Sequence, residues 1–248
     1  MINQFKTYHL RFVNKSRYVF LVVSIVLTQV VFAQKVKTIN LPNYDYQTLH
    51  FGFLLGINKA DFIVHPNPNL ALLDSVYVLE SVPQSGFNLG IISNLRLSEY
   101  SDLRFIPALA FSTRNLEYTF KSAKGDIKRK KSVESTFIEF PLDLKLKSAR
   151  YNNFRAYILV GVKYSIDIAS QKDVNSDLVT DAIVKLNKND YYYSIGVGFD
   201  FYQKYFKFSP ELKYNFGIRD LLVRDTNVFA KSIDKITSKI VNVSFTFE

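Results

Sequence analysis

From residue 49 onward, apolar and polar side chains alternate with a period of two, which predicts β-strands rather than helices. One side of each predicted strand carries no charged residue, whereas the other side collects the charges and eight of the nine glycines. The alternation predicts strands at residues 49–57, 86–97, 102–114, 134–147, 154–168, 190–203, 206–219 and 239–247.

Two β architectures can use such strands. A soluble sandwich or lipocalin-like barrel would bury the apolar face, whereas a membrane barrel turns that face toward lipid and the polar face toward its lumen. Glycines weaken a solvated strand face without benefit, but they suit the narrow interior of an eight-stranded barrel. We therefore predict an all-β fold, an eight-stranded antiparallel transmembrane β-barrel of the outer-membrane type.

The lengths of the predicted connections support this choice, because they alternate along the chain. Outer-membrane barrels alternate long outer loops with short periplasmic turns in the same way. The long connections are residues 58–85, 115–133, 169–189 and 220–238, and the short ones are 98–101, 148–153 and 204–205.

Three prolines conflict with this pattern, because Pro107, Pro141 and Pro210 lie inside predicted strands. A closed barrel has no free edge at which a missing N–H donor is harmless. We expect β-bulges at these positions.

The N-terminal residues predict export from the cytoplasm. Residues 1–17 are basic without an acid, and residues 18–33 are almost wholly apolar, as in a cleaved signal peptide. An uncleaved anchor helix is the alternative, although the run is shorter than the roughly 20 residues that span a membrane. We expect a signal peptide at 1–33, a short periplasmic N-terminal segment at 34–48 and the eight-stranded outer-membrane β-barrel at 49–248.

Composition excludes several kinds of chemistry. The chain has no cysteine, so thiol nucleophiles and cysteine-based metal sites are impossible. Its formal net charge of +10 includes the four cations of residues 1–17, and no concentrated basic stripe points to nucleic acid. A Ser-His-Asp hydrolase using His50 or His65 stays arithmetically possible. We nevertheless expect no catalytic residue, no metal site and no cofactor.

The polar strand faces predict a charged lumen. Buried charges must pair, so we expect a structural salt-bridged plug that closes the barrel to solutes, with a proton or substrate path as the alternative. Glu139 and Asp143 would lie ~13 Å apart along one strand, too far for the paired carboxylates of a glycosidase. The plug residues are Arg96, Arg104, Glu139, Asp143, Lys145, Arg155, Lys163, Asp167, Asp200, Glu211, Lys213 and Arg219.

Three predicted outer-loop segments are candidates for contacts. A basic loop would either attract anionic lipopolysaccharide or an acidic partner, or be a solvated hairpin tip. Residues 69–82 and 178–186 are unusually apolar for outer loops and are candidate protein contacts. The basic loop consists of Lys121, Lys124, Lys128, Arg129, Lys130 and Lys131.

Several sequence strings resemble the PorT/SprT family of Bacteroidetes. The strings are LPNYD at 41–45, HFGF at 50–53, GFNLG at 86–90, NLRL at 94–97, DLRFIP at 102–107, ESTFIEFPL at 134–142 and YSID at 164–167. The resemblance spans most of the chain after residue 40 and is most specific at 102–107 and 134–142. It implies an outer-membrane barrel of the type IX secretion system, needed to export cargo with C-terminal sorting domains and, in gliding species, surface adhesins. The family has no catalytic residue set to transfer.

We therefore predict a non-enzymatic accessory component of type IX secretion. It would work through contacts, because an eight-stranded lumen is too narrow for folded cargo. The expected partners are outer-membrane lipid and other type IX secretion components, without nucleic acid or a small-molecule substrate. The alternative is a small outer-membrane barrel for adhesion or envelope integrity without a secretion role.

Overall fold

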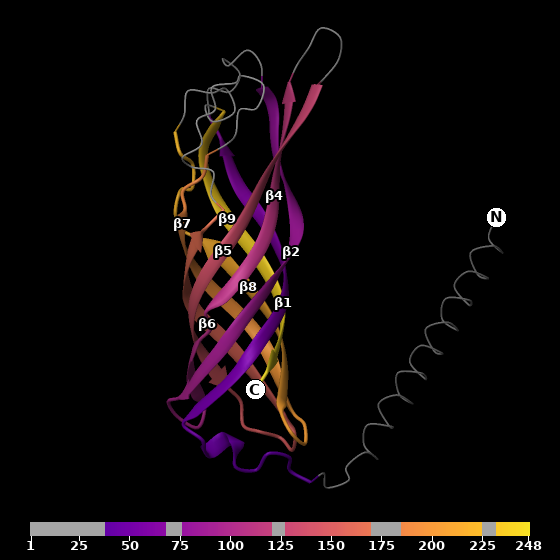
Figure 1. The fold of residues 1–248 in the computed structure, drawn as a ribbon, viewed down its shortest axis with the longest axis vertical. Coiled ribbons are helices and arrows are strands. Elements are labelled where there is room, and N and C mark those ends of the chain that lie inside the picture. The colour runs from indigo at the N-terminus through magenta and orange to yellow at the C-terminus, as the bar shows by residue number, and fades with distance from the viewer. Residues whose placement is uncertain (1–37, 68–75, 121–126, 170–184, 225–231) are drawn as a thin grey trace, which may run out of the picture. The chain divides into compact units, whose positions relative to one another are not determined.

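The computed structural model describes residues 38–67, 76–120, 127–169, 185–224 and 232–248 (Figure 1). The chain divides into two compact units, Met1–Ile39 and Asn40–Glu248, and the barrel is the second unit. The predicted signal peptide at 1–33 lies outside the described residues. Within the described ranges, no helix is both long and apolar enough to cross a membrane.

The second unit is a closed antiparallel barrel preceded by a short 3₁₀ helix, η1 (Tyr44–Tyr46). Its strands are β1 (Leu49–Pro66), β2 (Val76–Arg96), β3 (Ser101–Phe105), β4 (Ala108–Phe120), β5 (Ile127–Lys147), β6 (Phe154–Asp167), β7 (Asn189–Tyr202), β8 (Lys207–Gly217) and β9 (Ile233–Phe247). β3 and β4 share one register: Phe105 pairs with Ser93 and Leu142, and Ala108 pairs with Gly90 and Glu139. They therefore act as one stave of an eight-stave ring, in the order β1-β9-β8-β7-β6-β5-β3/β4-β2, which closes where β2 pairs with β1. The predicted fold class is confirmed.

The apolar face of each strand points outward. Ile158 is 48% exposed and Ile195 is 52% exposed, whereas their chain neighbours Tyr157 and Ser194 are each 3% exposed. Outward apolar and inward polar residues are the arrangement of a wall that faces hydrocarbon. The short connections 97–100, 148–153 and 203–206 then mark the periplasmic end of the barrel.

Aromatic pairs border this apolar wall at both ends. Phe87 and Phe111 stack with ring centroids 4.6 Å apart toward the extracellular end. At the periplasmic end, the ring centroids of Phe206 and Phe247 are 6.1 Å apart. Aromatic girdles of this kind lie at the two membrane–water interfaces of outer-membrane barrels.

The strands continue farther toward the extracellular end than the sequence predicted, so most of the expected loops 58–85 and 115–133 is strand. The reason is that the two faces of β1 exchange polarity after Ile57. The outward face carries Lys59 and Asp61, while inward-facing Ala60 and Phe62 are 0% and 4% exposed. Inward and outward residues still alternate above Ile57, but the outward face there no longer meets the condition of carrying no charge. The prediction therefore ended this strand too early. The reversal marks the outer edge of the membrane, above which the wall faces water.

Above this edge, apolar side chains fill the barrel interior. The cluster consists of Phe62, Leu116, Tyr118, Leu186, Leu221, Leu222, Ile233 and Ile236. Its members come from distant parts of the chain and pack as in the core of a water-soluble barrel.

The expected bulges at Pro107, Pro141 and Pro210 do not occur, because the register is the same before and after each proline. Pro107 does interrupt its strand, since it lies in the break between the end of β3 and the start of β4. The carbonyls of Pro107 and Pro141 still accept hydrogen bonds from the N–H groups of Ile91 (3.0 Å) and Ile106 (3.2 Å). Each proline therefore removes one donor without displacing the ladder. The register shifts of the described strands lie elsewhere, between residues 83 and 87, 76 and 78, and 65 and 66.

The polarity reversal on β1 predicts a position-dependent cost for a charge. Leu55→Arg should destabilise the barrel by about 2–4 kcal/mol, because the charge enters hydrocarbon, whereas Ile63→Arg on the same face should cost about 0–1 kcal/mol. Equilibrium unfolding in lipid vesicles measures both values. Equal costs at the two positions would contradict the assigned membrane edge.

Candidate functional site: a charged lumen and its periplasmic cap

Ion pairs cross the lumen between staves that are not neighbours. Arg104 on β3 lies 2.5 Å from Glu211 on β8, on the opposite side of the ring, and both side chains are at most 1% exposed. The Tyr157 hydroxyl donates a 2.6 Å hydrogen bond to the same Glu211 oxygen. Lys145 on β5 pairs with Asp200 on β7 at 2.8 Å. These contacts occupy the periplasmic half of the lumen with side chains.

Further pairs occupy the middle of the barrel. Lys213 on β8 pairs with Asp143 on β5, which also accepts a 3.2 Å hydrogen bond from the Ser194 hydroxyl. Lys163 on β6 pairs with Glu139 on β5. Because a buried charge without a partner is strongly unfavourable, these pairs hold the staves in one arrangement.

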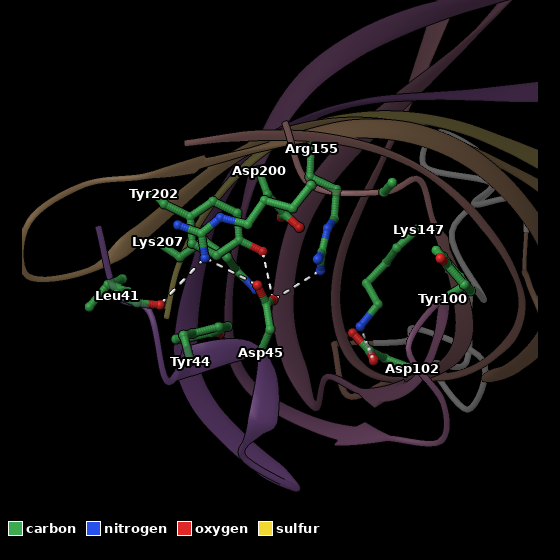
Figure 2. A network of polar contacts seen from close by, with 12 residues as sticks. Leu41, Tyr44, Asp45, Tyr100, Asp102, Lys147, Arg155, Asp200, Tyr202 and Lys207 are labelled. Atoms are coloured by element: carbon green, nitrogen blue, oxygen red, sulfur yellow. Dashed lines mark hydrogen bonds and ion pairs between the residues drawn. The ribbon is translucent and has the colours of Figure 1, made fainter. Parts of the chain in front are cut away.

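Residues Asn40–Gln47 form a cap beneath the periplasmic ends of the strands (Figures 1 and 2). Asp45 in η1 accepts hydrogen bonds from Arg150 (3.1 Å), Arg155 (3.0 Å) and the Tyr202 hydroxyl (2.9 Å). Burial alone would raise the pKa of Asp45, but Arg155, Arg150 and Tyr202 outweigh it and hold this pKa below its ordinary value. One carboxylate thus ties the cap to β6, β7 and the connection between β5 and β6.

Other contacts fix the rest of the cap. The Tyr44 hydroxyl donates to Glu248 (3.0 Å), and the Tyr44 ring stacks on His50 with centroids 4.0 Å apart. Arg150 donates to the carbonyl of Asn40, whose own N–H donates to the Asn153 side chain at 2.8 Å. The cap therefore contacts the barrel around much of its rim.

Some predicted plug residues have other environments. Arg96 is half-buried, with its guanidinium 6.0 Å from the Tyr46 ring in the cap. Asp167 accepts hydrogen bonds from the backbone N–H groups of Thr136 and Ala169. Arg219 was wrongly assigned to the lumen: β8 ends at Gly217, so Arg219 is exposed beyond the strand.

Sequence reasoning missed several charged residues of the lumen and the cap. Arg114 is 1% exposed and donates to the hydroxyls of Ser238 (2.8 Å) and Ser135 (3.1 Å). Arg114 has the same alternation as the inward-facing residues of β4, so the period of two could have identified it as a lumen residue. Alternation does not identify Asp45 or Arg150, because neither lies in a periodic segment. The other missed partners are Asp102, which pairs with Lys147, and Glu248, which pairs with Lys207.

The predicted basic loop is partly a pair of strands. Lys121 and Lys124 lie outside the described residues. Lys128, Arg129 and Lys130 are exposed at the start of β5, opposite Thr119, Tyr118 and Glu117 of β4, and Lys131 is half-buried. β4 and β5 extend together at the extracellular end, so this basic hairpin presents its cations to the outside (Figure 1). Residues 69–75 and 178–184 of the apolar loop candidates lie outside the described part.

His50 and His65, the two histidines within the described residues, do not form a Ser-His-Asp triad with the groups that they contact. His50 is bonded at 2.7 Å to the carbonyl of Tyr44, and His65 is exposed near the end of β1. The described part of the chain contains no group of three or more His, Asp or Glu side chains that could hold a metal ion.

The lipid-facing wall, closed ring and charged lumen define an outer-membrane β-barrel protein. The chain belongs to the family described as outer membrane protein beta-barrel domain, whose model matches residues 32–223. No curated protein matches the sequence.

Several solved barrels are similar in fold. Neisserial surface protein A is 10% identical, with 81% of this chain and 98% of that chain covered and a TM-score of 0.41. OprG of Pseudomonas aeruginosa is 14% identical, with 79% and 94% covered and a TM-score of 0.39. Ail of Yersinia pestis, in complex with the heparin analogue sucrose octasulfate, is 10% identical, with 81% and 99% covered and a TM-score of 0.36. Such distant likeness says nothing about what this chain binds.

The cross-lumen pair predicts a strong stability effect. Glu211→Leu should destabilise the barrel by about 3–5 kcal/mol because it leaves buried Arg104 with only the longer 3.6 Å pair to Glu248, and adding Arg104→Met should recover most of this loss. Arg219→Ala is the exposed control and should change stability by less than about 0.5 kcal/mol. Unfolding in vesicles measures all three variants. A double variant as unstable as the single one would contradict the pairing.

The cap should detach when Asp45 loses its charge. Because the folded pKa lies below the ordinary value of 3.8, the carboxylate stabilises the docked cap above that pH, and the stabilisation disappears as the pH falls through the folded value. Pepsin cleavage within residues 40–47 should therefore increase in this acid range for the wild-type barrel. Asp45→Asn should be cleaved readily at all these pH values. Equal cleavage of variant and wild type throughout would contradict the Asp45 contact.

Proposed function

We propose that this outer-membrane barrel is a non-enzymatic accessory component of type IX secretion that acts through contacts rather than by conducting cargo. The observation that carries the proposal is the filled interior. The Arg104–Glu211 pair crosses the lumen, the cap lies beneath it, and an apolar cluster fills the extracellular end. A salt-bridged plug then closes the barrel to solutes, and export must use another conduit.

The position of the PorT/SprT-like strings supports the secretion role. The string at 41–45 supplies Asp45 to the cap, and the string at 102–107 supplies Arg104 to the lumen. The string at 134–142 supplies Glu139, which pairs with Lys163. The resemblance therefore falls on the residues that close this barrel, rather than on lipid-facing residues alone. Residues 1–33 would act as the cleaved export signal.

A second candidate function is adhesion or envelope integrity. The observation that favours it is the basic hairpin, whose exposed Lys128, Arg129 and Lys130 would attract lipopolysaccharide or an acidic partner. The secretion role requires contacts with translocon subunits, whereas adhesion or envelope integrity would depend on the cations of the basic hairpin.

Deletion of the gene should leave cargo with C-terminal sorting domains unsecreted, because the translocon would lack a contact that it needs. Immunoblots of culture supernatant and cell fractions measure this, with the wild-type gene restored as control. A K128Q/R129Q/K130Q variant should restore secretion if the cap and wall carry the role. Detergent co-purification should recover translocon subunits. Normal secretion in the deletion strain, with reduced adhesion, would contradict the secretion role and favour the second function.

A further inference from the structure

The outer wall contains an apolar groove to which the proposed function assigns no ligand. It has a volume of about 410 Å³ and lies across β1, β2, β4 and β5. Its floor is one register row, in which Leu54 pairs with Gly90 and Gly90 pairs with Ala108. A Cβ at Gly90 would lie 3.1 Å from both the Cβ of Ala108 and the Cγ2 of Ile106, so a larger residue here would have to displace these neighbours by a few tenths of an ångström.

Two rows of outward side chains form the walls of this groove. Phe53, Ile91 and Pro107 line the periplasmic side. Leu55, Leu89, Leu109 and Ile138 line the extracellular side. No charged or polar side chain is among the lining residues. Because Pro107 has a compact ring and no N–H to return to Ile91, the wall is both hollowed and less tightly bonded here.

The groove begins at the middle of the apolar belt, at Phe53, and extends to Leu55, toward the outer edge of the belt. Along β1, the outward residues above Phe53 are Leu55, Ile57 and then exposed Lys59. Four residues of strand place Lys59 about 13 Å along the chain from Leu55, at the membrane edge. Lys239 on β9 is its diagonal neighbour, since Lys59 pairs with Val241 and Asp61 with Lys239.

The one acid in this group is already engaged. Asp61 accepts hydrogen bonds from the Ser81 hydroxyl (2.6 Å) and from the Phe62 N–H (2.8 Å). Hydrogen bonds from neutral donors leave the charge of Asp61 in place, so Lys59, Lys239 and Asp61 together give the membrane edge above the groove a local net charge of +1, which attracts anionic headgroups.

We propose that this groove is a binding site for one acyl chain of an anionic outer-leaflet lipid, with Lys59 contacting the phosphate of its headgroup. The groove is continuous with the lipid-facing wall, so hydrocarbon rather than water is the medium that fills it. Its apolar lining accepts a chain, and its cationic edge selects the charge of the headgroup. The site depends on the barrel fold and not on a role in secretion.

The chain contains no tryptophan, which makes single-tryptophan variants direct reporters of bound lipid. Phe53→Trp places the reporter on the groove wall, at a residue that is 51% exposed. Ile195→Trp is the matched control: it is 52% exposed on β7, the stave opposite β2, and like Phe53 it lies near the middle of the outward apolar run of its strand. Each variant is refolded into phosphatidylcholine vesicles that contain a minor fraction of brominated phosphatidylglycerol or brominated phosphatidylcholine.

Fluorescence of F53W should be quenched preferentially by brominated phosphatidylglycerol, with about fivefold higher apparent affinity than for brominated phosphatidylcholine. I195W should show no such preference. Adding Lys59→Gln to F53W should abolish the preference, and adding Leu109→Phe should reduce quenching by both lipids by filling the groove. Heat-modifiable gel mobility verifies folding of every variant.

Equal headgroup preference at both reporter positions would overturn the proposal, because it would show ordinary surrounding lipid only. A preference at F53W that survives Lys59→Gln would overturn the headgroup contact. These outcomes are independent of secretion, which the deletion strain measures.

Discussion

The structure depends on one constraint: in hydrocarbon, every backbone N–H and C=O must find its partner within the sheet. The sheet therefore closes where β2 pairs with β1, and closure directs one face of each strand into a narrow lumen. Because that face carries the charges, Arg104, Lys145 and Lys213 must pair with carboxylates from other staves. The charged lumen is thus a consequence of the lipid-facing wall rather than a separate feature.

The same constraint ends at the membrane edge. Above Ile57, lipid no longer dictates the outer face, so Lys59 faces outward and Phe62 turns inward. The interior consequently holds most of its ion pairs within the membrane, and its largest apolar cluster lies above it, next to buried Arg114. With Asp45 docked at the periplasmic end, the two ends of the lumen are closed by different chemistry, ionic below and apolar above.

The sequence predicts the strands correctly where apolar and polar residues alternate and the apolar face of the strand carries no charge along its whole length. The inward phase of Arg104 and Glu211 followed from alternation, but their pairing across the ring did not, because it depends on barrel closure.

Arg219 was misplaced because nothing local marks the end of β8 at Gly217. A pattern of one uncharged face does not predict the upper part of β1 as strand, because its faces exchange polarity after Ile57. The cap was missed because the contacts of Asp45 are more than 100 residues away in the chain. Pro107 and Pro141 were expected to force bulges, yet the register tolerates the loss of single donors.

The central claim is that the apolar face of the strands points into hydrocarbon up to the membrane edge and not beyond it. Nitroxide labels at Ile158, Ile195 and Ile63 test this directly, through their collision rates with oxygen and with a water-soluble nickel chelate. The account predicts that oxygen reaches Ile158 and Ile195 more readily than the chelate does, and that the order reverses at Ile63. Preferential access of the chelate to Ile158 and Ile195 would contradict it.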